Sequence, residues 1–190
     1  MSAVESQMLE LGTAAVDFSL PDVDGNLHSL RTDASAYLVM FICNHCPFVK
    51  HIREELAQLG HDYLPRDVAI YAINSNDAET YPGDSPEKMR EESRKWGYEF
   101  PYLVDADQEV AKSYMAACTP DFYLFDSDKR LVYRGQLDGS RPANNIPVSG
   151  RDLRAAIDAI LNNSEVPGEQ TPSIGCSIKW KRGNKPAWFS

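Results

Sequence analysis

The chain has 190 residues, 43% of them hydrophobic and 25% charged, which suits one compact domain with extensions. Its formal net charge of −9 produces a field that repels phosphate backbones, so we exclude nucleic acid as a partner. The longest apolar run, residues 37–43, is far shorter than the ~18 residues that a membrane-crossing helix needs, so no membrane partner is expected.

The first predicted elements are a hairpin, a strand and a helix. Residues 17–30 place two short apolar segments around Asp24-Gly25, which is typical of a β-hairpin. Residues 37–42 are apolar throughout, as expected of a central strand that is covered on both faces. A helix should follow, because apolar residues then recur at helical spacing until Gly60, a stop signal; they are Phe48, Ile52, Leu56 and Leu59.

Strands and helices continue to alternate. Residues 68–73 form a second candidate for a buried strand, and Ser85-Pro86 starts a charged helix that Gly97 can end. The remaining predicted elements are a strand at 102–104, a short helix at 110–115, a hairpin of 122–125 with 131–133, and a last helix that starts near Ser149 with Asp152 in a capping box.

The two ends of the chain differ from its middle. The segment beyond Asn163 is rich in Pro, Gly and Ser, yet it carries too much apolar surface to stay in water, including Ile178 and Trp180. We therefore divide the chain into an N-terminal extension at 1–11, one domain at 12–163, and a C-terminal tail at 164–190 that packs back on the domain.

Two cysteines carry the strongest chemical signal. Cys43 and Cys46 lie between the first core strand and a helix, so both thiols are expected at a helix N-terminus. The helix dipole and unpaired N–H groups there stabilise a thiolate, the form that attacks disulfides. We predict that Cys43 is the nucleophile and Cys46 the resolving thiol, and that His45 tunes the pair.

The number of cysteines and the first residues of the chain predict the cellular compartment. Four cysteines are too few for a disulfide scaffold, and a close pair in a reducing compartment indicates redox chemistry or metal binding. Residues 1–12 contain two Glu and no Lys or Arg, unlike a secretory signal. Taking Met1 as the true start, we expect the protein in the cytoplasm.

Four segments resemble a known family. They are Val16-Asp17-Phe18-Ser19-Leu20-Pro21, Cys43-Asn44-His45-Cys46-Pro47-Phe48, Thr119-Pro120-Asp121-Phe122 and Pro172-Ser173-Ile174-Gly175-Cys176. Over residues 12–181 the chain is similar to the peroxiredoxin-like branch of the thioredoxin-fold redoxins, the AhpC/TSA type, here with a Cys-x-x-Cys motif. The resemblance implies an α/β, thioredoxin-like fold, with a central mixed β-sheet flanked by helices.

The cysteine pair and the resemblance together lead us to predict an activity. We expect a thiol-disulfide oxidoreductase with no cofactor and no metal, acting on a disulfide- or thiol-containing protein or small molecule together with an unidentified electron donor. Pro120 would be the cis-proline that faces the active-site cysteines. The backbone at Thr119 would then be available to pair with an extended thiol substrate.

This sequence departs from the better-known relatives at several positions. Ile42 stands where thioredoxin-like redoxins usually have Trp, and Pro47 follows the cysteine pair instead of separating it. In peroxiredoxins a Thr and a distant Arg build the peroxide site. Cys43 replaces that Thr, and Pro120 falls where the Arg would lie, so strong peroxidase activity is not expected.

Two other functions stay open. In a thiol-dependent peroxidase, an antioxidant function, Cys46 would be oxidised to sulfenic acid and Cys43 would condense with it. In a metal-binding or interaction module, Cys43, His45 and Cys46 would need ligands from elsewhere, and no His follows His61.

Two further cysteines have open roles. Cys118, two residues before Pro120, is either a third redox thiol within reach of the motif or a core residue. Cys176 either resolves a disulfide, caps Cys118, or is idle.

Overall fold

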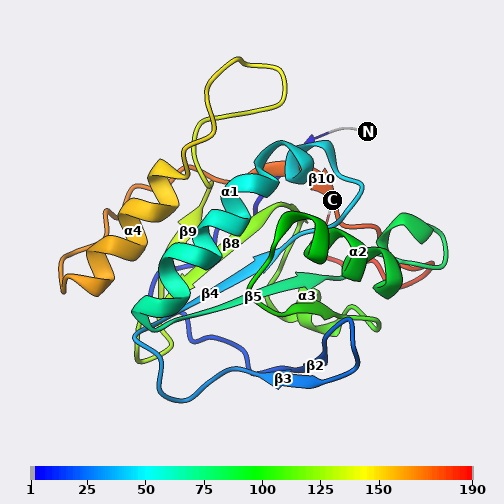
Figure 1. Cartoon of the computed structure of the whole chain (residues 1–190), viewed down its shortest axis with the longest axis horizontal. Coiled ribbons are helices and arrows are strands. Elements are labelled where there is room, and N and C mark those ends of the chain that lie inside the picture. Colours follow the sequence, from blue (N-terminus) through cyan, green and yellow to red (C-terminus); the bar gives the residue numbers. More distant parts are fainter. Residues whose placement is uncertain (1–2, 190) are drawn as a thin grey trace.

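A mixed five-stranded sheet forms the centre of the computed structural model, which describes residues 3–189 (Figure 1). The strand order is β6-β5-β4-β8-β9. The central strand, β4, pairs parallel with β5 and antiparallel with β8. The strands are β4 (Ala36–Phe41), β5 (Val68–Asn74), β6 (Tyr102–Val104), β8 (Asp121–Phe125) and β9 (Leu131–Gly135). The predicted mixed α/β architecture is thereby confirmed.

Helices and a hairpin cover the two faces of this sheet. The helices α1 (Pro47–Tyr63), α2 (Pro86–Trp96) and α4 (Arg151–Leu161) pack on one face (Figure 1). The opposite face is covered by α3 (Glu109–Ser113) and by residues around the hairpin of β2 (Ser19–Pro21) and β3 (Leu27–Ser29). Two short 3₁₀ helices, η1 (Leu64–Arg66) and η2 (Pro82–Asp84), complete the helical elements of residues 3–189.

Strand β4 explains why its sequence is apolar without alternation. Leu38 and Met40 point into the core on the α1 side, whereas Tyr37, Val39 and Phe41 point into the core on the hairpin side. All five side chains are fully buried. The prediction of a central strand covered on both faces is therefore confirmed.

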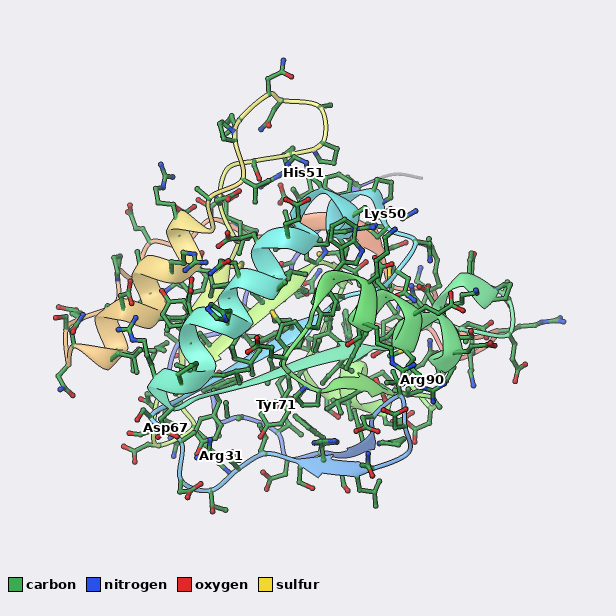
Figure 2. The ribbon with its side chains drawn as sticks, in the orientation of Figure 1. Arg31, Lys50, His51, Asp67, Tyr71 and Arg90 are labelled. Atoms are coloured by element: carbon green, nitrogen blue, oxygen red, sulfur yellow. The ribbon has the colours of Figure 1, made fainter. Side chains whose placement is uncertain are left out.

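Polar contacts tie the segment after the hairpin to the sheet. Figure 2 shows that Arg31, Asp67 and Tyr71 lie close together. The Arg31 guanidinium donates to Asp67 Oδ1 over 2.9 Å, and the Arg31 backbone N–H donates to the Tyr71 hydroxyl over 3.0 Å. These bonds fix the chain just before it enters β4.

Both ends of the chain meet in a second, three-stranded sheet. Strand β10 (Ile174–Ser177) lies between β1 (Ala3–Glu5) and β7 (Cys118–Thr119), and pairs antiparallel with each. Ile178, just beyond β10, is 3% exposed, so the expectation that the tail packs back is confirmed. Strands β1 and β7 were not predicted.

Two helix boundaries differ from the sequence prediction. Helix α1 continues through Gly60 to Tyr63, because Gly60 packs against the ring of Phe100, where an added Cβ would lie 3.0 Å from the nearest ring carbon. Helix α4 starts after Gly150 and not at a Ser149 capping box. The Leu137 carbonyl oxygen accepts the first-turn N–H groups of Asp152 and Leu153 over 3.2 Å, and the Asp138 carboxylate holds the residues just before the helix by accepting from the backbone N–H groups of Ser149 and Gly150 over 2.7 Å.

Among residues 3–189, no helix combines the length and the apolar character that spanning a bilayer requires.

Candidate active site

Cys43 and Cys46 lie at the end of β4 and the start of α1. The backbone N–H of Ile42 still donates to Ile73 of β5 over 3.0 Å, so the chain leaves the sheet at Cys43. Cys46 is the residue that caps the N-terminus of α1, with Pro47 in the first turn. Both cysteines are buried, at 1% and 0% exposure, and their thiols lie close enough to shift each other's pKa. The expected placement of two thiols at a helix N-terminus is confirmed.

Thr119 and Pro120 face this pair from the next part of the sheet. The peptide bond between them is cis, as the resemblance implied. Cys43 Sγ lies 3.3 Å from Thr119 Oγ1, and the Cys46 thiol donates to the Thr119 carbonyl oxygen over 3.1 Å. The structure thus brings together four predicted site residues, Cys43, Cys46, Thr119 and Pro120.

The backbone edge at Thr119 is already paired. Cys176 of β10 stands opposite Thr119, and Ser177 stands opposite Cys118. The expectation that this edge is open to an extended substrate is therefore wrong for this structure. The chain supplies the pairing strand itself, from a tail more than fifty residues downstream.

A buried carboxylate, Asp84 of η2, holds the loop between the cysteines. Asp84 Oδ1 accepts the Asn44 backbone N–H over 2.8 Å, and Oδ2 bonds His45 Nδ1 over 2.5 Å. Oδ2 also accepts from Asn76 Nδ2 over 2.8 Å, and Tyr81 stacks on the His45 ring. Sequence reasoning missed Asp84, because the only signal was an acidic residue in a loop some forty positions away.

These contacts place the negative charge of Asp84 beside the thiols. Burial raises the pKa of Asp84, but the hydrogen bonds from His45 and Asn76 outweigh it and hold the pKa below its usual range. Asp84 is therefore ionised at neutral pH, and it orients His45 while it repels a thiolate at Cys43.

The two thiols differ strongly in acidity. The hydrogen bond from the Cys43 thiol lowers the pKa of Cys46 to about 5, against the effect of burial. The Cys176 thiol and the backbone N–H groups of Val49 and Cys176 add to this lowering. The pKa of Cys43 is raised well above its ordinary value by its bond to Cys46, by burial and by the charge of Asp84. Of the two thiols, Cys46 therefore has the lower pKa and ionises first, and the role of Cys43 as nucleophile stays a prediction.

Cys118 and Cys176 lie on different sides of the three-stranded sheet. Neighbouring residues along a strand point to opposite faces, so Cys118 points away from the face that carries Thr119. The Cys118 thiol contacts the Pro120 carbonyl oxygen at 3.6 Å, and burial raises its pKa well above the ordinary value. Among the described residues, it has no hydrogen bond to the cysteine pair. Cys176, in contrast, lies near enough to Cys46 to help lower the pKa of that thiol.

Three side chains come close enough to hold a cation. Atoms of Cys43, His45 and Asp84 lie within 4.8 Å of one another, so Asp84 is the extra ligand type that the metal-binding alternative lacked in the sequence. Yet both Asp84 oxygens and His45 Nδ1 already bond within the protein. In this structure these hydrogen bonds fix the loop between the two cysteines.

A small pocket lies beside Pro120, next to the projecting loop between β9 and α4 (Figure 1). Figure 2 places His51 on the first turns of α1 beneath this loop. The other lining residues include Phe48, Phe122, Leu137, Arg141 and Ile174. The segment 136–142 therefore borders the pocket beside Pro120.

A known protein family matches most of the chain. The family model described as the AhpC/TSA family matches residues 11–134. No curated protein matches the chain.

Solved structures show the same fold. A crystal structure of an uncharacterized conserved protein from Geobacillus kaustophilus is 59% identical, with a TM-score of 0.93, and the match covers 95% of this chain and 97% of that one. The thioredoxin domain of a thiol-disulfide oxidoreductase from Bacteroides vulgatus is 19% identical, with a TM-score of 0.56 and coverage of 67% and 91%. Peroxidoxin BcpB from Mycobacterium tuberculosis is 16% identical, with a TM-score of 0.59 and coverage of 82% and 98%. The predicted thioredoxin-like fold is confirmed.

Proposed function

Because the chain belongs to the AhpC/TSA family, we propose that it is a thiol-disulfide oxidoreductase in which Cys43 and Cys46 alternate between two thiols and one disulfide. The observation that carries this proposal is the pair of buried thiols at the start of α1, both of which contact Thr119. Structures described as a thiol-disulfide oxidoreductase and as a peroxidoxin share its fold, in line with sulfur chemistry.

The proposed reaction has two exchange steps. Cys43 transfers its proton to the nearby Cys46 thiolate and attacks one sulfur of a substrate disulfide, forming a mixed disulfide. The substrate S–S bond breaks, and its other half leaves as a thiolate. Cys46 then gives its proton to that thiolate and attacks Cys43 Sγ in the mixed disulfide. The second half of the substrate leaves, the Cys43–Cys46 disulfide forms, and the substrate has gained two electrons. Run backwards, the same steps oxidise a dithiol.

His45 and Asp84 are positioning residues in this scheme. They hold the backbone between the two cysteines through the bonds at Asn44 N–H and His45 Nδ1. The charge of Asp84 also disfavours a lasting thiolate on Cys43, so Cys43 carries negative charge only as it attacks.

One observation favours a second candidate function. The lowered pKa of Cys46 makes this residue the standing thiolate, which is what a peroxidase requires of its peroxide-reactive thiol. In that reaction Cys46 attacks peroxide, becomes a sulfenic acid and releases water or alcohol. Cys43 then condenses with it to form the disulfide and a water molecule.

Variants that each lack one cysteine of the pair separate the two functions. We would mix reduced Cys43→Ser and Cys46→Ser proteins with oxidised glutathione and, separately, with hydrogen peroxide in a stopped-flow instrument. The oxidoreductase proposal predicts that Cys46→Ser forms a stable mixed disulfide at Cys43, and that Cys43→Ser loses turnover of the disulfide. Rapid peroxide oxidation of Cys43→Ser, with an unreactive Cys46→Ser, would instead establish the peroxidase.

A further inference from the structure

The C-terminal tail lies against the cis-proline segment as an added strand. Besides the pairing of Cys176 with Thr119, the Ile178 backbone N–H donates to Ala117 over 3.1 Å, and Ser173 Oγ donates to the Pro120 carbonyl oxygen over 2.7 Å. Strand addition at an open sheet edge is how proteins recognise extended peptides. The tail therefore occupies the place that an extended peptide substrate would take beside Thr119.

Gly175 shapes the tail for this position. A Cβ added at Gly175 would lie 2.0 Å from the Thr119 carbonyl oxygen and 2.6 Å from the Thr119 carbonyl carbon. Both are backbone atoms, so neither can rotate away as a side chain would. Only glycine lets the tail approach this closely, and the approach brings the next residue, Cys176, up to the redox pair.

Cys176 faces the thiols of the proposed redox pair. Residues directly opposite each other on antiparallel strands project to the same face, so Cys176 shares the face of Thr119, whose hydroxyl contacts Cys43. The thiol and the backbone N–H of Cys176 both help to lower the pKa of Cys46. Cys46 thus lies near two other thiols, one from its own motif and one from the tail.

We propose that Cys176 is a third redox thiol, held by β10 in the position of a substrate cysteine, which exchanges with the Cys43–Cys46 disulfide. The Cys176 thiolate attacks Cys46 Sγ, the Cys43–Cys46 bond breaks, and the Cys46–Cys176 bond forms. Cys43 leaves as a thiolate and takes up the proton that Cys176 released. One disulfide replaces another, so the step needs no oxidant or reductant.

This inference rests on the proposed function, and it gives the site a second oxidised form. In that form Cys43 is again a free thiol while the tail is covalently attached to α1. Cys118 takes no part, because it points to the other face of β7.

The test maps disulfides after oxidation with one equivalent of diamide, using alkylation, proteolysis and mass spectrometry. We expect the wild-type protein to contain both the Cys43–Cys46 and the Cys46–Cys176 linkages, and Cys43→Ser to contain Cys46–Cys176. Adding Gly175→Ala to Cys43→Ser should slow formation of that linkage by on the order of 10²-fold, because the tail can no longer approach the backbone of Thr119 closely. Gly168→Ala is the matched control, since an added Cβ there has no atom within 4 Å.

The outcomes distinguish this inference from the proposed function. If Cys43–Cys46 forms in the wild type but Cys176 stays open to alkylation in both proteins, the inference is wrong and the proposed function stands. If the wild type forms no Cys43–Cys46 disulfide, the proposed function fails and the inference fails with it. A Cys118–Cys176 linkage in place of Cys46–Cys176 would also overturn the inference.

Discussion

At the scale of single residues, the site depends on how its charges are distributed. The Cys46 thiolate accepts hydrogen bonds at a helix N-terminus, whereas Cys43 lies beside the buried carboxylate of Asp84. Two thiols three positions apart in sequence thus have opposite pKa shifts. The motif alone predicts that one of them ionises readily, but not which one, since Asp84 comes from a distant segment.

Replacing the Cys43 thiol tests the cause of the Cys46 shift. In Cys43→Ala the largest donor to Cys46 is lost, so the pKa of Cys46 should rise from about 5 toward the ordinary thiol value of about 8.5. The measurement is thiolate absorbance at 240 nm against pH, with Cys43→Ala/Cys46→Ala as the blank. An unchanged titration midpoint would show that the helix N-terminus, and not Cys43, sets the acidity.

Asp84→Asn tests the second half of the electrostatic account. Removing this charge should lower the pKa of Cys43, measured in a Cys46→Ser background, because the nearby repulsion disappears. Loss of the bond network around a fully buried side chain should also destabilise the protein by about 1–3 kcal/mol in urea unfolding. Exposed Asp128→Asn is the control, and equal effects of both substitutions would contradict a specific role for Asp84.

At the scale of elements, sequence patterns predicted the strands and helices whose buried residues lie close together in the chain. Continuous apolar residues indicated β4 and β5, and helical spacing indicated α1, since each pattern follows directly from contacts with neighbouring layers. Gly60 misled the prediction of the end of α1, because its missing side chain serves packing against Phe100. The short strands β1 and β7 could not be predicted. Their three and two residues carry no periodic signal, and they exist only by pairing with β10.

A buried ion pair joins β8 to β9 beneath the cis-proline segment. Arg134 donates to both oxygens of Asp121, the second over 2.9 Å, and Ser6 Oγ donates to Asp121 over 2.6 Å. Both charged side chains are fully buried. This pair anchors the residue that follows Pro120, and it also ties the start of the chain to the site.

Breaking this pair should cost far more than breaking a surface pair. Arg134→Met leaves Asp121 buried without its countercharge, so we expect a loss of about 3–5 kcal/mol in the free energy of unfolding. Glu91→Gln removes the exposed 2.7 Å pair of Lys88 and Glu91 and should cost less than about 0.5 kcal/mol. Urea denaturation of both variants checks the contrast, and a small loss for Arg134→Met would contradict it.

At the scale of the whole molecule, the proposed redox site is covered by segments from the two ends of the chain. Strand β10 brings Cys176 to Cys46, and β1 covers the outer edge of β10. The cysteine motif and its helix could be predicted from one short stretch of sequence. The three-stranded sheet that covers the motif could not be predicted, because it combines segments near residues 4, 119 and 176, each too short to predict alone.

The acidity of Cys46 links the site to global stability. A thiol whose pKa is lower in the folded state than in the unfolded chain stabilises the fold above its unfolded pKa, and that stability is lost as the pH falls through its folded value. The stability advantage of the reduced wild type over Cys46→Ala should therefore grow as pH rises from about 5 to about 8.5. Urea unfolding across this range measures it. The difference in unfolding free energy between the wild type and Cys118→Ala should stay constant between pH 5 and 8. A difference between the wild type and Cys46→Ala that does not change with pH would contradict the lowered pKa of Cys46.

The most direct measurement of the redox pair is its titration with glutathione. The wild-type protein would be equilibrated in buffers of increasing oxidised-to-reduced glutathione ratio, quenched with acid, alkylated and mapped by mass spectrometry. We expect the Cys46 thiol to disappear in a reversible two-electron step together with the Cys43 thiol or, in the form with the Cys46–Cys176 disulfide, with the Cys176 thiol, while Cys118 stays alkylated throughout. If Cys43 and Cys46 remain alkylated as free thiols at every ratio, the two are not a redox pair and the central claim is wrong.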